Sequence, residues 1–218
     1  MPVLRKMYWL YPKKKQSDTL FIAYDAKDPR NFSPPGQNWG ALTGEECDRV
    51  LSLSKSEQSI QLPNAQNNYL PRDYHQASMV SINYNEETKW LWQKVVNNLT
   101  SANENWWNFD VYGIVEPLQV LCYDASKGKE GEKDRWEPHI DNAHPFSCRK
   151  ISFSIELSDP NTYKGGELKV YASEKPIDLP NSRGTAIMFP SFFLNEVKPV
   201  VEGQRWVLIG WISGPQFK

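Results

Sequence analysis

The second half of the chain, from about Val111 onward, consists of short strand-like segments separated by turns. The clearest segment alternates apolar and polar residues, with Ile151, Phe153, Ile155 and Leu157 set against Ser152, Ser154 and Glu156. A period of two predicts a half-buried strand. Further strands are expected at 115–123, 167–171, 184–189, 193–200 and 205–212, with a turn at 159–166 and another at 202–204. Many short strands joined by Gly and Pro turns predict an antiparallel sandwich or barrel of jelly-roll type.

The first half carries two helical patterns. Thr43 and Glu46 form a capping-box pair that predicts a helix from residue 43 to about 54. A second helix is expected from a cap at Asn85 to about Ala102. Their apolar residues recur at helical spacing, which predicts helices packed against a sheet: Cys47, Val50 and Leu51 in the first, and Leu91, Val95, Val96 and Leu99 in the second.

Strands are also expected at 20–24 and 77–83, and no linker or internal repeat divides the chain. The sequence therefore predicts one domain over residues 1–218. Residues 1–112 would supply supporting helices and strands, and residues 113–218 a jelly-roll core. The expected fold class is mostly β, a double-stranded β-helix with supporting N-terminal helices.

Charge and cysteine content argue against several functional classes. The net charge is −1, from 25 basic and 26 acidic residues. Nothing in this balance favours binding to nucleic acid or to an anionic membrane, and no apolar run is long enough to span a bilayer. Met1–Lys15 lacks the pattern of a signal peptide. Three cysteines without metal-binding spacing are typical of reduced thiols, so we expect a cytoplasmic protein.

One short motif points to chemistry. His139 and Asp141 are two residues apart, so in an extended segment both side chains leave the same face. An imidazole and a carboxylate on one face are two of the three ligands in the facial triad that holds Fe(II) in non-heme oxygenases. By itself the motif is weak evidence, because a surface turn is the commoner meaning of such a pattern.

The residues around this motif form an ordered series: Tyr123, Trp136, His139–Asn142, Lys150–Asp159, Tyr163–Leu168, Gly184–Ser191, Glu196–Val200, Gly203–Trp206 and Gly210–Ile212. From about residue 113 to 218 the chain resembles the 2-oxoglutarate and Fe(II) dependent dioxygenases, in particular the prolyl 4-hydroxylase-like branch with its bacterial and phage-type relatives.

The resemblance implies a jelly roll in which His139 and Asp141 bind Fe(II). It also implies that Arg205 pairs with the distal carboxylate of 2-oxoglutarate, and that Tyr123 hydrogen-bonds the same co-substrate. An Arg suits this task because its planar fork binds a carboxylate through two parallel hydrogen bonds. The implied reaction uses molecular oxygen, with ascorbate as reductant, to hydroxylate an unactivated C–H. The substrate would be a peptide, a protein or a small molecule. By analogy with the family, the hydroxylated group would be a prolyl or other amino-acid side chain.

One position departs from the family pattern. The family places a second histidine ten residues before the arginine, where this chain has Asn195. The remaining histidines are badly placed for that role, since His144 is too close to Asp141 and His75 lies outside the matching region. The expected metal site is therefore His139, Asp141 and Asn195. An amide oxygen is a poor replacement for imidazole, so iron affinity should fall.

Three explanations for Asn195 remain open. The first is a deliberate change that disables a working enzyme. The second is a natural change in a protein that has lost turnover. The third is that Asn195 serves as an adequate ligand in an altered site, directly or through water. The leading hypothesis is an oxygenase with one altered ligand. The alternative is a catalytically silent binding module that holds a peptide or a small acid in the same cleft. A plain jelly-roll lectin or structural module is opposed by the ordered series of His139, Asp141 and Arg205.

Secondary expectations concern tryptophans and loops. Trp136, Trp206 and Trp211 are expected to serve packing rather than chemistry. Substrate specificity is expected to lie in the loops Lys127–Asp134 and Asp28–Gly40, because loops above a rigid sheet usually carry it.

Overall fold

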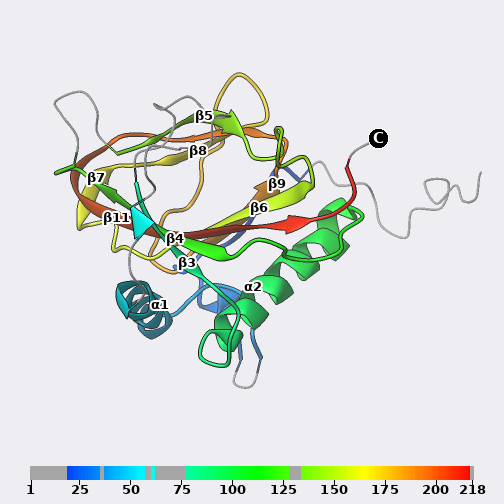
Figure 1. The fold of residues 1–218 in the computed structure, drawn as a ribbon, viewed down its shortest axis with the longest axis horizontal. Coiled ribbons are helices and arrows are strands. Elements are labelled where there is room, and N and C mark those ends of the chain that lie inside the picture. Colours follow the sequence, from blue (N-terminus) through cyan, green and yellow to red (C-terminus); the bar gives the residue numbers. More distant parts are fainter. Residues whose placement is uncertain (1–18, 35–36, 57–59, 62–76, 128–133, 217–218) are drawn as a thin grey trace, which may run out of the picture.

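The computed structural model describes residues 19–34, 37–56, 60–61, 77–127 and 134–216. Two antiparallel sheets face each other, with the helices beneath the larger one (Figure 1). The larger sheet has the order β1-β9-β6-β11-β4-β3-β2, with β7 paired to β11. Its strands are β1 Ile22–Tyr24, β2 Ile60–Gln61, β3 Ser78–Ile82, β4 Leu118–Asp124, β6 Arg149–Glu156, β7 Tyr163–Gly165, β9 Ala186–Pro190 and β11 Val200–Ser213.

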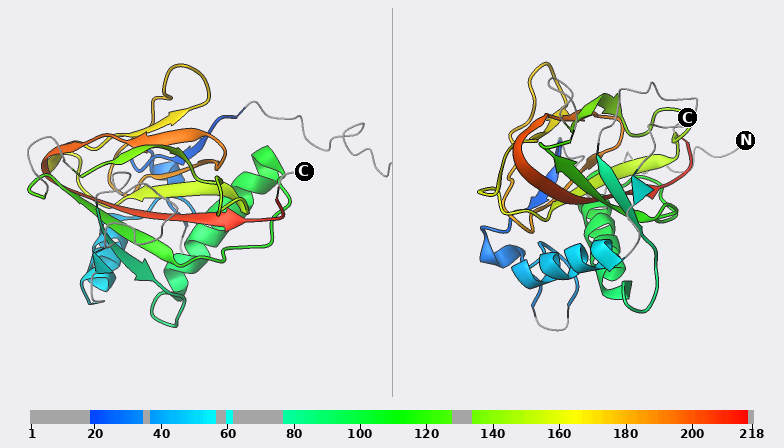
Figure 2. Two further views of the ribbon diagram at one scale, coloured as in Figure 1. Left: turned by 45° about the horizontal axis from the view of Figure 1, so that its top comes forward. Right: turned by 60° about the vertical axis from the view of Figure 1, so that its left-hand side comes forward.

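The smaller sheet has the order β5-β10-β8, with β5 Trp136–Ile140, β10 Leu194–Val197 and β8 Leu168–Tyr171. Figure 2 shows this sheet lying over the larger one, with β11 bending from one layer into the other at one end. The mostly β jelly-roll prediction is confirmed.

The helices α1 (Gly44–Ser56) and α2 (Lys89–Ala102) cover the outer face of the larger sheet, as Figure 1 shows. Their buried apolar residues form one cluster with residues of β3, β4, β6, β9 and β11. Together these residues form the main hydrophobic core, so the two helices support the sheet as predicted.

Both helix starts can be compared with the expected caps. The Thr43–Glu46 capping box is confirmed, since each side chain accepts a hydrogen bond from the other residue's backbone N–H, at 3.1 and 2.8 Å. The predicted start of the second helix at Asn85 is wrong. Asn85 and Thr88 bind each other's backbone in a preceding turn, and α2 begins at Lys89. Val96 is 39% exposed rather than part of the core.

Strand β6 differs from the expected half-buried strand in an informative way. All eight of its residues are buried. Ile151, Phe153 and Ile155 face the helices, within the main core. The polar residues between them point into the space between the two sheets, because side chains alternate across a strand.

The end of the chain also differs from expectation. Glu202–Gln204 was predicted to be a turn, but it lies inside the long strand β11. Gly203 has φ of +74°, and a Cβ there would lie 2.2 Å from the carbonyl oxygen of Thr162 on the neighbouring segment. Glycine is therefore required for close strand contact rather than for a turn. Similarly, β7 forms within the predicted turn 159–166.

Among the described residues, no helix is long and apolar enough to cross a membrane.

Candidate active site

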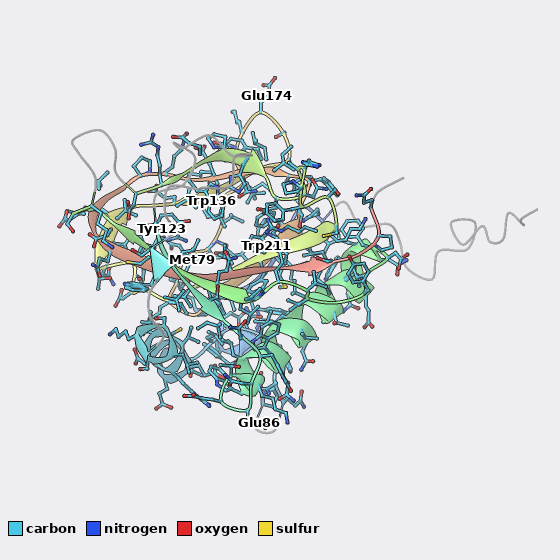
Figure 3. All side chains as sticks on the ribbon, in the orientation of Figure 1. Met79, Glu86, Tyr123, Trp136, Glu174 and Trp211 are labelled. Carbon is cyan, nitrogen blue, oxygen red and sulfur yellow. The ribbon has the colours of Figure 1, made fainter. Side chains whose placement is uncertain are left out.

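A narrow pocket lies between the two sheets. Its walls come from β4, β5, β6, β8, β9, β10 and β11. Figure 3 shows the labelled side chains of Tyr123, Trp136 and Trp211 between the sheets, and all three line this pocket. The pocket also contains every residue that the sequence assigned to the site: His139, Asp141, Asn195, Arg205 and Tyr123.

His139 is held in a defined orientation on β5. Its Nδ1 lies 2.7 Å from the carbonyl oxygen of Glu137. A carbonyl oxygen can only accept, so Nδ1 is the donor in this hydrogen bond, which fixes the orientation of the ring. The ring stacks on Trp136 at 4.7 Å between centroids and 14° between planes. Nε2 lies 3.4 Å from Oδ1 of Asp141, so two of the predicted ligands converge.

Asp141 directly follows β5 and is buried. The Ser152 hydroxyl donates to its Oδ2 at 2.6 Å, and that hydroxyl also lies 2.9 Å from the hydroxyl of Ser191. Burial alone would raise the pKa of Asp141, but the neighbouring His139 ring and the Ser152 hydroxyl outweigh burial and lower it. The carboxylate is therefore kept ionised, the form that binds a metal.

Asn195 completes the group. It stands opposite His139 in the β5–β10 register. Its Nδ2 lies 3.4 Å from Oδ2 of Asp141 and 3.4 Å from the carbonyl oxygen of His139. The three predicted residues are thus brought together, although no group of three or more His, Cys, Asp or Glu side chains in the described part of the chain could hold a metal.

A second group lies elsewhere in the same pocket. Arg205 stands opposite Tyr123 in the β4–β11 register, with its guanidinium carbon 5.9 Å from the centre of the tyrosine ring. Both side chains are buried. Burial raises the pKa of the Tyr123 hydroxyl, so Tyr123 is a neutral hydrogen-bond donor.

The sequence did not identify the partner of Arg205. Its Nε donates to Oε2 of Glu156 at 2.8 Å, in a pair whose side chains are 6% and 5% exposed. Its Nη1 is buried and has no hydrogen-bond partner among the described residues. The only available signal was that Glu156 falls on the polar side of the β6 alternation.

The remaining predicted residues divide between the pocket wall and positions away from it. Trp206 packs against the helix-side core, whereas Trp136 and Trp211 line the pocket. His144 lies in the exposed turn after Asp141, and His75 is outside the described residues. Most of Lys127–Asp134 is also outside them.

The position of the loop Asp28–Gly40 does not match its predicted role in substrate specificity. Asn98 of α2 binds both backbone groups of Gly40, and Asn97 donates to the carbonyl oxygen of Asn38. None of the described residues of this loop lines the pocket. The loop is anchored on the helical side, so its predicted part in substrate specificity is not supported by its position.

The residues present fit an iron and a dicarboxylate. An imidazole nitrogen and a carboxylate are ligands that non-heme Fe(II) uses. Nε2 of His139 and Oδ1 of Asp141 lie 3.4 Å apart, so both ligand atoms reach the same point in the pocket. The unpartnered Nη1 of Arg205 is a buried donor that an incoming carboxylate would satisfy.

Comparison with known proteins agrees with this geometry. Residues 118–213 match the family model of the 2OG-Fe(II) oxygenase superfamily. Over these residues the chain is similar to that superfamily. The matched segment runs from β4 to the end of β11, so it contains all five predicted site residues.

Curated proteins similar to this chain include two PKHD-type hydroxylases. One, from Prochlorococcus marinus, is 35% identical over 133 residues, or 55% of this chain and 60% of the relative. Another, from Rippkaea orientalis, is 37% identical over 126 residues, or 56% and 55% of the two chains. The chain spans between about a third and three fifths of the length of the curated relatives it matches.

Solved structures share the fold. A Trichoplax adhaerens prolyl hydroxylase, in complex with a hypoxia inducible factor peptide fragment, has a TM-score of 0.66 at 19% identity, covering 96% of this chain and 94% of that one. A viral collagen prolyl hydroxylase from Paramecium Bursaria Chlorella virus-1 has a TM-score of 0.60 at 16% identity, covering 91% and 98%. These matches show that the chain shares its fold with these two prolyl hydroxylases over most of its length.

Proposed function

We propose that this protein is an Fe(II)- and 2-oxoglutarate-dependent oxygenase that hydroxylates an unactivated C–H of a prolyl or other amino-acid residue, with one iron ligand altered. The observation that carries the proposal is the convergence of His139 Nε2 and Asp141 Oδ1 in a pocket that also holds the unpartnered Nη1 of Arg205. His139 and Asp141 can bind a metal, and Arg205 can bind a carboxylate. The pocket therefore suits a co-substrate that chelates the metal at one end and carries a carboxylate at the other.

Each residue has a defined part in this proposal. His139 and Asp141 hold the iron, with Asn195 at the third position. Arg205 binds the distal carboxylate of 2-oxoglutarate, and the Tyr123 hydroxyl donates to the same group. Trp136 fixes the imidazole plane by stacking and excludes water from that side. When bound, the iron and co-substrate supply the oxidising power for C–H hydroxylation, with ascorbate as the proposed reductant.

The substrate class rests on the relatives. The Trichoplax enzyme was solved with a peptide fragment, and the curated relatives are PKHD-type hydroxylases. We therefore propose a peptide or protein substrate. A cytoplasmic location remains a prediction, as does the absence of nucleic-acid and membrane partners.

Asn195 supports a second candidate, a binding module without turnover. The amide is buried and packs against Asp141. An amide oxygen binds a transition metal more weakly than imidazole does. A protein with the same pocket but weak iron binding would hold a peptide or small acid without oxidising it.

The deciding experiment compares the protein with Asn195→His. Fe(II) affinity is measured anaerobically, and succinate formation is measured with Fe(II), ascorbate and 2-oxoglutarate. His139→Ala serves as the control that removes a ligand common to both hypotheses. We expect the unaltered protein to bind Fe(II) and form succinate, and Asn195→His to bind Fe(II) at least about tenfold more tightly, because imidazole is the stronger ligand.

The alternative outcomes separate the hypotheses. Turnover only in Asn195→His would mean that Asn195 disables an intact oxygenase site. Weak iron binding and no succinate in both proteins would overturn the proposal and favour the binding module.

A further inference from the structure

Arg205, the residue proposed to bind the distal carboxylate of 2-oxoglutarate, is already paired with a carboxylate of the protein. Glu156 and Arg205 form a pair that is more than nine-tenths buried, with Nε donating to Oε2 at 2.8 Å. The guanidinium has five N–H donors, and its buried Nη1 has no hydrogen-bond partner among the described residues. Arg205 lines both the active-site pocket and a second, larger cavity, and Glu156 lines the second cavity.

The ion pair of Glu156 and Arg205 opposes the binding of 2-oxoglutarate at Arg205. With Glu156 ionised, Arg205 is already neutralised. A second carboxylate at the same guanidinium would add an uncompensated negative charge in a buried site. Two carboxylates that share one buried position do not both stay ionised, and one of them takes up a proton.

We propose that Glu156 is the proton acceptor of the co-substrate site, which takes up one proton when the distal carboxylate of 2-oxoglutarate binds Arg205 and returns it when the co-substrate leaves. This inference rests on the proposed function. The proton comes from solvent and no other bond is made or broken. Protonated Glu156 still accepts from Nε of Arg205 through its carbonyl oxygen, and its new O–H donates to the hydroxyl oxygen of Tyr163, its neighbour on β7.

Glu156, rather than one of the groups that surround it, takes up this proton. Arg205 faces it from β11, Tyr163 from β7 and Tyr123 from β4, and Cys47 of α1 contacts its backbone carbonyl. Its neighbours Thr185 and Ala186, before and within β9, carry no titratable group. The charged residues in the second cavity balance one another, with Lys164 and Lys169 against Glu167 and Asp178.

The titration of Glu156 fits this role. Burial raises its pKa and outweighs the lowering effect of Arg205, even before any second acid is present. Arg205 stays charged, because its pKa is raised. Tyr163 and Tyr123 stay neutral, because burial raises their pKa values. A further negative charge at Arg205 would raise the pKa of Glu156 again.

The test is anaerobic titration calorimetry of the Fe(II)-loaded protein with 2-oxoglutarate at pH 6, 7 and 8. Each titration is repeated in two buffers of different ionisation enthalpy, which gives the number of protons taken up. We expect close to one proton per 2-oxoglutarate at pH 8. Above the pKa of Glu156 in the free protein, Kd should rise by about tenfold per pH unit.

Three comparisons isolate Glu156. The monoacid 2-oxobutyrate lacks the distal carboxylate and should bind without proton uptake, which excludes protons released or bound at the metal. Glu156→Gln keeps an acceptor for Nε, and should remove both the proton uptake and the pH dependence. Its Kd at pH 8 should fall below that of the unaltered protein. Glu167→Gln, in the second cavity, should keep the proton uptake.

Binding of 2-oxoglutarate without proton uptake in the unaltered protein would overturn this inference alone, whatever the stability of the variants. Proton uptake that persists in a folded Glu156→Gln would also overturn it. Failure of both 2-oxoglutarate and 2-oxobutyrate to bind at any pH would overturn the proposed function as well.

Discussion

Asn195 stands directly opposite His139 in the antiparallel pair of β10 and β5. Residues opposite each other in such a pair point to the same face and lie close together. The backbone register therefore directs any side chain at position 195 toward His139 and Asp141. Substitution at this position changes the chemistry of the group without requiring the sheet to move, which makes Asn195→His a clean comparison.

Removal of the hydroxyl beside Asp141 should weaken metal binding. In Ser152→Ala, Oδ2 of Asp141 loses a 2.6 Å hydrogen bond that orients the carboxylate. We expect Fe(II) affinity to fall about tenfold or more, as is usual when the partner of a ligand is lost. Ser154→Ala is the matched control, since Ser154 lines the same pocket from the same face of β6, two residues further along the strand. Equal losses in the two variants would contradict the role of Ser152.

A methyl group at Gly166 should disturb Arg205, the residue proposed to bind the distal carboxylate of 2-oxoglutarate. A Cβ there would lie 3.0 Å from Cδ of Arg205 and 2.6 Å from Cγ2 of Val200, at a φ of +71°. Gly166→Ala should therefore weaken 2-oxoglutarate binding more than Fe(II) binding, when both are measured by calorimetry. Gly44→Ala, whose Cβ meets nothing closer than 3.9 Å, should affect neither. A parallel loss of both affinities in Gly166→Ala would indicate general destabilisation instead.

Arg149 should contribute strongly to stability. It pairs with Glu116, and its guanidinium carbon lies 3.5 Å from the centre of the Trp211 ring. Arg149→Met should lower the free energy of unfolding by about 2–4 kcal/mol, because Glu116 loses its partner and the cation–π contact is lost. Urea denaturation provides the measurement. Lys164→Met breaks an exposed pair with Glu202 and should cost less than about 0.5 kcal/mol.

Two of the three thiols should be unreactive in the native state. Burial raises the pKa of Cys47 and of Cys122 to about 12, and thiolate is the reactive form. At pH 8 a thiol-specific chromogenic disulfide should therefore label only Cys148, which is partly exposed. Cys148→Ser should abolish the native reaction, while denaturation should release two thiols. Rapid native labelling of Cys148→Ser would contradict the buried placement.

Local patterns in the sequence predicted much of this fold. Alternation located the strands of the second half, and the Thr43–Glu46 pair located the start of α1, because both signals are encoded within a few residues. The motif of His139 and Asp141 and the arginine at 205 located the candidate site, once the wider resemblance gave them context. The start of α2 was misplaced because Asn85 caps a turn rather than the helix.

Long-range features could not be predicted in the same way. The polar face of β6 was assigned to solvent, because alternation distinguishes two faces but does not tell which one another sheet covers. The hydrogen bond from Ser152 to Asp141 and the ion pair of Glu156 with Arg205 follow from that second sheet. The Asp28–Gly40 loop was predicted to carry specificity because loops above a rigid sheet often do, whereas its bonds to Asn97 and Asn98 place it on the helical side.

The pairing of β1 with β9 and of β3 with β4 has a consequence for dissecting the protein. All five candidate site residues belong to residues 113–218, yet a fragment of that length would expose two strand edges and the apolar face that the helices cover. Open edges of this kind are templates for intermolecular pairing. We expect such a fragment to aggregate, and we expect intact protein to unfold in a single cooperative transition shared by both halves.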